Sequence, residues 1–243
     1  MNELEELYSL AQISLVAERY QDASKYIEEL IKKKKDDLSI GERNIFYNSF
    51  KFMINSKRNA WISANLMEDY LNEEDKEENI EKINIVKNYK IILENEVFNI
   101  CKVVIFLINE FLLTKTILDE SKIFYLRMKG DYYRYLCEFK SLSENKNYIE
   151  ESEKNYKMAV DLSQNVLSIN PIKLGLYLNY SVFYYEIKKD KKKAIQIAKE
   201  AVKNTKKYSD KLKKEEDKDT EMSIQALKKN INNWEDEERK NIN

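Results

Sequence analysis

Glycine and proline are almost absent from this chain, and their scarcity limits the folds that it can adopt. The 243 residues include three glycines (Gly41, Gly130 and Gly175) and one proline, Pro171. Sheets joined by tight turns, and the phosphate-binding loops of α/β enzymes, need many more of both residues. A hydrophobic content of 43% is still enough for a packed core. We therefore predict an all-α protein.

Apolar residues recur with the 3.6-residue period of amphipathic helices along almost the whole chain. The pattern predicts about nine helices joined by short polar connections. Their expected ranges are 3–17, 18–35, 39–71, a long helix from 80 to 113, 119–141, 147–168, 170–187, 190–205 and 219–236.

Two helix starts carry specific signals. Ser39 is followed three residues later by Glu42, the pattern of a capping box. Asn170 before Pro171 pairs a preferred N-cap residue with proline at the first helical position. Between the third and fourth helices, the charged residues 71–79 indicate a solvated loop.

Several classes of function are disfavoured by the composition. The chain has no histidine, which removes the commonest general base and metal ligand, and it has no glycine-rich phosphate loop. Cys101 and Cys137 lack metal-ligand spacing and are expected to be reduced core residues. The net charge of −1 gives no general attraction to nucleic acid or membrane. We expect a cytoplasmic protein that is not an enzyme and that needs no cofactor and no metal.

The second half of the first helix is apolar nearly all round. Its apolar positions are Leu10, Ala11, Ile13, Leu15, Val16 and Ala17. A helix without a polar face needs two neighbours. Burial inside the chain and contact with another subunit both remain open for this helix.

The stretch "FYLRMKGDYYRYLCEF" (124–139) places Arg127 and Arg134 among tyrosines and phenylalanines. A buried helix disfavours such fixed charge, and a solvated helix disfavours so many aromatics, so an anionic partner is indicated. The two arginines are seven residues apart and therefore share one helix face. The pairs Lys51/Arg58, Asn179/Glu186 and Ser223/Asn230 repeat this spacing in three further helices. Any single pair can arise by chance in a charged helix.

Taken together, the four helices resemble the signature segments of the 14-3-3 family. The matching stretches are "AERYQDA", "ERNIFYNSFKFMINSKRNAW", "SKIFYLRMKGDYYRYL", "PIKLGLYLNYSVFYYEI" and "DTEMSIQALKKNINNW". They cover nearly the whole chain, in order and at matching separations. The resemblance implies a cup-shaped subunit of nine antiparallel helices with a concave amphipathic groove. It implies a single domain over 1–234, with dimerisation helices at about 3–36 and a short tail at 235–243.

The resemblance also implies a function, which is binding of client peptides that carry phosphoserine or phosphothreonine. The phosphate would be held by Lys51, Arg58, Arg134 and the hydroxyl of Tyr135. The peptide would be contacted by Arg127, Leu178, Asn179, Val182, Glu186, Asn230 and Trp234. Met222, Ser223 and Ala226 form a thinner apolar wall than is usual in the family.

An arginine fork suits a phosphoryl group because the phosphate carries about −1.5 to −2 charges and three acceptor oxygens. We expect these arginines to be kept apart from carboxylates and packed against tyrosines. Asp131 lies between Arg127 and Arg134 in the sequence. It either orients one arginine or forms a solvated ion pair.

The resemblance further implies a homodimer, with a heterodimer as the alternative. The dimer contact would use Ile13, Ala17, Arg19, Ala64, Met67, Tyr89 and Glu96. Within this contact, Arg19 and Glu96 match one inter-subunit ion pair of the family. Asp22 matches one member of a second such pair, but Ile92 replaces its usual lysine. Ala60 stands where many members have a phosphorylatable serine.

Two other hypotheses about function compete with that of a phosphopeptide adaptor. Residues 181–202 look like a tetratricopeptide helix pair, as in a scaffold for unmodified peptides, but no repeat of about 34 residues recurs. Nucleic-acid binding through the lysine-rich runs is disfavoured because acidic residues interrupt almost every run.

Overall fold

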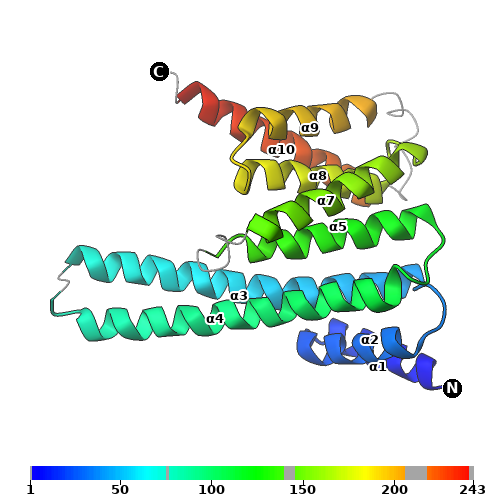
Figure 1. Ribbon diagram of the computed structural model, residues 1–243, viewed down its shortest axis with the longest axis horizontal. Coiled ribbons are helices and arrows are strands. Elements are labelled where there is room, and N and C mark those ends of the chain that lie inside the picture. The colour runs from blue at the N-terminus through cyan, green and yellow to red at the C-terminus, as the bar shows by residue number, and fades with distance from the viewer. Residues whose placement is uncertain (1, 75–76, 140–145, 206–217, 241–243) are drawn as a thin grey trace. The chain divides into compact units, whose positions relative to one another are not determined.

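The computed structural model describes residues 2–74, 77–139, 146–205 and 218–240, and within them it has nine α-helices and no strand (Figure 1). The all-α fold and the number of helices are therefore confirmed. The helices are α1 (Glu3–Val16), α2 (Tyr20–Lys33), α3 (Ile40–Glu74), α4 (Ile80–Leu107), α5 (Asp119–Leu136), α7 (Lys146–Leu162), α8 (Pro171–Glu186), α9 (Lys191–Thr205) and α10 (Lys218–Lys240).

Both predicted helix starts are confirmed. The backbone N–H of Ser39 donates to the Glu42 carboxylate at 2.6 Å, and the Glu42 N–H donates to the Ser39 hydroxyl at 3.2 Å. At the start of α8, the Asn170 side chain accepts a hydrogen bond from the backbone N–H of Ile172 at 2.9 Å. Pro171 is the first residue of that helix. These local contacts satisfy N–H groups that would otherwise lack partners at the helix ends.

Two helices extend further than the sequence pattern predicts. α3 continues past residue 71 to Glu74, because Leu71 is buried at 7% exposure and the Asn72 amide donates to the backbone oxygen of Glu68. α10 continues to Lys240, so the expected tail at 235–243 begins as helix. Residues 241–243 lie outside the described ranges.

Three other helices, α4, α5 and α7, end several residues earlier than expected. α4 gives way after Leu107 to a π-helical turn, Ile108–Leu112, in which the Leu113 N–H donates to the Ile108 oxygen. α5 ends at Leu136 in a tightened turn, and the last two residues expected in it, 140–141, lie outside the described ranges. α7 ends at Leu162 and is followed by a 3₁₀ turn at Ser163–Asn165.

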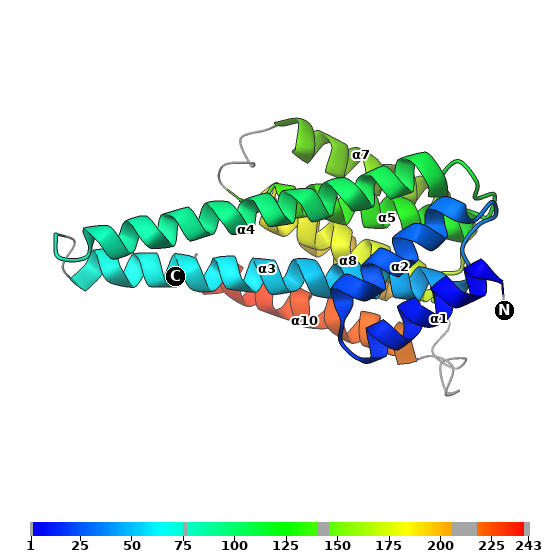
Figure 2. The ribbon, with the colours of Figure 1, turned by 90° about the horizontal axis from the view of Figure 1, so that it is seen from below.

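The described chain forms two compact units, residues 1–116 and 117–243. In the first unit, α3 and α4 are long antiparallel neighbours, and α1 and α2 pack against the N-terminal part of α3 (Figures 1 and 2). Fully buried apolar side chains from these helices form its core, among them Ile27, Phe46, Ile54 and Val97. The far ends of α3 and α4 project beyond α1 and α2.

In the second unit, α5 packs against both α7 and α8, while α8, α9 and α10 pack against one another. Tyr125, Tyr156 and Phe183 are among its fully buried side chains. Tyr156 of α7 packs against Phe183 of α8, with ring centroids 5.6 Å apart. The aromatic side chains of α5 thus belong to the core of this unit, and the same packing fixes the charged residues between them.

Candidate functional site

Three charged residues of α5 are buried together with its aromatic residues. Arg127 is 8% exposed, Arg134 is 6% exposed and Asp131 is 2% exposed. Burial of charged groups costs free energy unless they are paired and hydrogen-bonded, so these three residues depend on the groups around them.

Arg134 lies between an aromatic ring and two carboxylates. Its guanidinium carbon is 4.6 Å from the centre of the Tyr135 ring. Its Nη1 donates to Oε1 of Glu138 at 3.0 Å and to Oε2 of Glu186 on α8 at 3.3 Å. Packing against a tyrosine was expected, but the expectation that this arginine is kept apart from carboxylates is wrong. A buried guanidinium without a bound anion needs these acceptors.

The guanidinium of Arg134 remains charged despite its burial. Desolvation alone lowers the pKa of this group, but interactions with Tyr156, Tyr135 and Asp131, and also with Glu138, outweigh it and raise the pKa well above its usual value. Arg134 is therefore a fixed cation at the boundary between α5 and α8.

Asp131 is held inside the second unit by partners from two other helices. Its Oδ1 accepts a hydrogen bond from the Tyr156 hydroxyl of α7 at 2.5 Å. The Asn179 amide of α8 donates to both of its oxygens, at 2.9 and 2.8 Å. The alternative that Asp131 forms a solvated ion pair is therefore wrong. Burial, followed by the Asp131 charge, raises the pKa of Tyr156 well above its usual value, so its hydroxyl stays a donor.

α8 and α10 contribute the other predicted peptide-contacting residues of this unit. Leu178, Asn179 and Val182 are half-buried, and Glu186 is exposed. On α10, Asn230 is half-buried, and Trp234 is buried beneath Tyr185 of α8 in a stack with ring centroids 4.6 Å apart. The structure thus brings Arg134, Asn179 and Glu186 together through direct contacts between α5 and α8.

Arg127 reaches from α5 onto α8 at Gly175. A Cβ atom at residue 175 would lie 2.4 Å from Nη1 of Arg127, so the guanidinium occupies the space that the glycine leaves. The same guanidinium lies 5.2 Å from the centre of the Phe124 ring. The observed position of the Arg127 guanidinium therefore requires that residue 175 has no side chain.

Lys51 and Arg58 lie on α3 in the first unit. Lys51 is half-buried, with its Nζ 5.1 Å from the centre of the Tyr47 ring. Nη1 of Arg58 donates to Oδ1 of Asn55 at 3.2 Å. The seven-residue spacing places Lys51 and Arg58 on one face of the helix.

Comparison with known proteins identifies the family. The family model described as 14-3-3 protein matches residues 10–235. The chain belongs to the 14-3-3 family. It is 35% identical over 232 residues to 14-3-3-like protein D of Nicotiana tabacum, covering 95% of this chain and 92% of that protein. It is 33% identical over 234 residues to 14-3-3 protein 2 of Entamoeba histolytica, covering 96% of this chain and 97% of that protein.

This 14-3-3 family member exposes an apolar surface on its first unit. Ile13 is 66% exposed, Val16 80%, Met67 52% and Tyr89 50%. One of the two alternatives for the first helix was burial inside the chain. That alternative is wrong for Ile13 and Val16, because both side chains are exposed.

The other residues expected at the dimer contact differ in their surroundings. Ala17 is exposed and Ala64 is nearly covered within the chain, at 9% exposure. Arg19 pairs with Asp22 of its own chain. Glu96 pairs with Lys57, at 2.7 Å.

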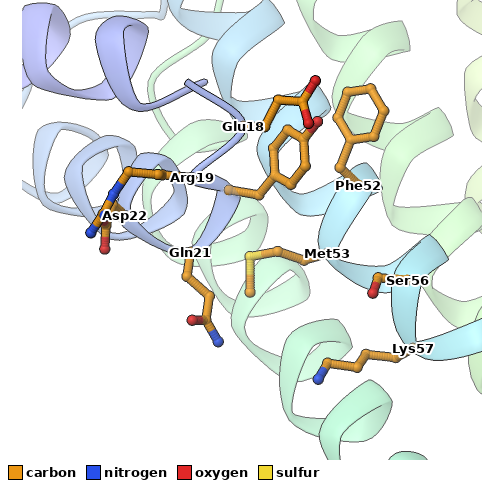
Figure 3. A pocket seen from close by; sticks show the side chains of 9 residues that line it. Glu18, Arg19, Gln21, Asp22, Phe52, Met53, Ser56 and Lys57 are labelled. Atoms are coloured by element: carbon orange, nitrogen blue, oxygen red, sulfur yellow. The ribbon is translucent and has the colours of Figure 1, made fainter. Parts of the chain in front are cut away.

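The first unit also has a cavity of about 500 Å³. It is lined by residues 18–22 at the turn between α1 and α2 and by Phe52, Met53, Ser56 and Lys57 of α3. Figure 3 shows Arg19 and Asp22 side by side, with Phe52 and Met53 on the facing helix. Tyr20 stacks on Phe52 with ring centroids 4.6 Å apart, which fixes the turn against α3.

Sequence reasoning missed three residues around the arginines. Glu138 could have been found, because it lies four residues after Arg134 on the same helix. Tyr156 and Gly175 lie on other helices, and only the packing of those helices against α5 places them beside Asp131 and Arg127.

Residues 2–74, 77–139, 146–205 and 218–240 contain neither a metal-binding cluster nor a membrane-spanning helix. In these ranges no group of three or more cysteine, aspartate or glutamate side chains could hold a metal ion. No helix there is long and apolar enough to span a bilayer.

Proposed function

We propose that this protein is an adaptor that binds client proteins at phosphoserine or phosphothreonine, and that it catalyses no reaction. The observation that carries the proposal is Arg134, a buried and permanently charged guanidinium that faces Tyr135 and lies at the contact of α5 with α8. Membership of the 14-3-3 family supports the adaptor role.

A phosphoryl group can replace the acceptors that Arg134 now uses. The contact with Glu186 is long, at 3.3 Å, and the Glu186 side chain is 45% exposed, so this acceptor can be displaced. A phosphate oxygen offers a charge-assisted bond worth about 1.5–3 kcal/mol in return. In the proposed complex Lys51, Arg58 and the Tyr135 hydroxyl also contact the phosphate.

The remaining residues of the proposed groove would bind the peptide around the phosphorylated residue. Asn179 and Asn230 hydrogen-bond its backbone, and Leu178 and Val182 form an apolar wall. Glu186 and Trp234 support that part of the groove, and Arg127 also faces it.

The wall on α10 is expected to hold residues next to the phosphate loosely. The Ser223 hydroxyl already donates to the backbone oxygen of Asp219 at 2.9 Å, and Ala226 is small. Met222 is the large apolar side chain of this group, and it is 67% exposed. We therefore expect the phosphate and the peptide backbone to supply most of the binding energy.

We further propose that the protein acts as a dimer in the cytoplasm, as a homodimer or as a heterodimer with a related chain. Two grooves in one dimer would let it bridge two phosphorylated segments, which raises the apparent affinity for clients that carry both.

The deciding experiment is fluorescence anisotropy with an arginine-rich phosphoserine peptide and its unphosphorylated twin. The wild type and Lys51→Glu are titrated at a fixed salt concentration. We expect binding that requires the phosphate, and a loss of at least about tenfold in Lys51→Glu, because a cation that contacts the phosphate becomes an anion. Lys102→Glu makes the same charge change at an exposed position of α4 and is the matched control.

The possible results separate the proposal from its alternatives. Equal binding of both peptides would instead favour a helical scaffold for unmodified peptides. Equal losses in Lys51→Glu and Lys102→Glu would mean that the peptide responds only to overall charge.

A further inference from the structure

We propose that Asp131 is a positioning residue that fixes the Asn179 amide for binding the backbone of the client peptide. The inference rests on the proposed function, because it assigns a cause to the orientation of a peptide-contacting group. Asp131 itself is 2% exposed and lies beneath the surface that the peptide would contact.

The chemistry of the two groups allows one orientation of the amide. A carboxylate accepts hydrogen bonds and donates none, so only the NH₂ end of Asn179 can face Asp131. Nδ2 of Asn179 lies 2.9 and 2.8 Å from the two carboxylate oxygens. One N–H can serve both of them. The amide oxygen and the second N–H then remain for the N–H and C=O groups of an extended peptide.

The carboxylate is itself held by a residue of α7. The Tyr156 hydroxyl donates to it, and the Tyr156 ring is fully buried between α5 and α8. Gly130, next to Asp131, lets this ring approach so closely that a Cβ atom there would lie 3.0 Å from it. Ser152, on the same helix as Tyr156, donates to the Gly130 oxygen at 2.9 Å. These contacts leave Asp131 little freedom to move.

A positioning role of Asp131 and a purely electrostatic role predict different effects on the binding of phosphate. The negative charge of Asp131 interacts with Arg134 and opposes the arrival of a second anion there. If Asp131 acted through charge alone, its removal would strengthen binding of any phosphate. If Asp131 acts through Asn179, its removal weakens binding of the peptide backbone. The affinity for inorganic phosphate is then not reduced.

Asp131→Asn tests this distinction with almost no change in shape. The new amide can present NH₂ toward the NH₂ of Asn179, which breaks their pairing and lets the Asn179 amide turn. We expect the dissociation constant of the phosphopeptide to rise about tenfold. Inorganic phosphate, measured as a competitor of the labelled peptide, should bind the variant at least as well as the wild type. Asp161→Asn, at an exposed position of α7, is the control and should change neither value.

A double-mutant cycle shows whether Asp131 acts through Asn179. Asn179→Ala removes the amide, so adding Asp131→Asn to it should cause no further loss of peptide affinity. Additive losses, or an equal loss of affinity for phosphate and peptide, would indicate a general structural defect and overturn the proposal. If Asp131→Asn does not fold, Tyr156→Phe loosens the same carboxylate, and unchanged peptide affinity in that variant would also overturn it.

The proposed function and this inference fail in different ways. A wild type that discriminates between the phosphorylated and unphosphorylated peptides, together with an Asp131→Asn variant of equal affinity, contradicts only the role of Asp131. A wild type that binds the phosphorylated and unphosphorylated peptides equally contradicts the proposed phosphate site. The proposed role of Asp131 is then contradicted as well.

Discussion

At the scale of the residue, Glu153 of α7 shows how one carboxylate joins two helices of the second unit. It accepts hydrogen bonds from Lys157 at 2.6 Å and from Lys188 and Tyr184 at 3.0 Å. Desolvation raises the pKa of this carboxyl, but the hydrogen bonds from Lys157, Lys188 and Tyr184 outweigh it and lower the pKa to about 2. Glu153 therefore stabilises the folded state only when it is ionised.

The depressed pKa predicts a loss of stability in acid. The stabilisation by Glu153 is complete above the pKa of the unfolded state, about 4.3, and is lost as the pH falls toward the folded-state pKa of about 2. After allowance for solvent screening we expect about 1 kcal/mol. Urea unfolding between pH 5 and 2.5 should therefore show a smaller pH dependence in Glu153→Gln than in the wild type. Parallel pH profiles would contradict this assignment.

At the scale of the element, the packing of α5 against α7 depends on Gly130. A Cβ atom there would lie 3.0 Å from Cδ1 and Cε1 of Tyr156, whose ring is fully buried and cannot withdraw. Gly175 on α8 faces a different neighbour, the terminal nitrogen of the long Arg127 side chain, which can turn aside. Gly130 therefore makes room for a rigid group, the Tyr156 ring, whereas Gly175 makes room for the end of a flexible side chain, Arg127.

The contrast predicts opposite effects of the same substitution. In Gly130→Ala, overpacking should cost about 1–3 kcal/mol, more than the gain of up to about 1 kcal/mol from helix propensity. In Gly175→Ala the propensity gain should dominate, so the free energy of unfolding should be unchanged or higher. Urea denaturation of both variants tests this prediction. A Gly130→Ala variant as stable as the wild type would show that α5 and α7 can separate without loss.

At the scale of the whole molecule, the exposed apolar residues of α1, α3 and α4 predict self-association. Ile13, Met67 and Tyr89 are each half or more exposed in the single chain. Arg19 and Glu96 of the predicted contact form the ion pairs Arg19–Asp22 and Lys57–Glu96. These are surface pairs worth about 0–1 kcal/mol, so apolar burial should decide the assembly.

Sedimentation velocity at micromolar concentration should therefore show a dimer. Ile13→Glu should give a folded monomer, because it places a charge at an exposed position that only a partner would cover. Ile40→Glu is the matched control, since Ile40 is 71% exposed and lies outside the predicted contact. A monomeric wild type, or a dimer that persists in Ile13→Glu, would contradict the predicted interface.

The sequence by itself determined the features that depend on neighbouring residues. The scarcity of glycine and proline predicted the all-α fold, and Ser39 with Glu42 and Asn170 with Pro171 predicted two helix starts. Capping and helical periodicity act over three to seven residues, so one stretch of chain contains all the information they need.

Only the tertiary structure decided the surroundings of the buried charges. Asp131 meets Tyr156 and Asn179, which lie 25 and 48 residues away, and Arg134 meets Glu186 at a separation of 52. These contacts arise from the way in which α7 and α8 pack on α5, and no local pattern in α5 specifies them. The same reason explains why α3 continues past residue 71, because Leu71 is buried in the folded chain and the charged residues that follow it do not reveal this burial.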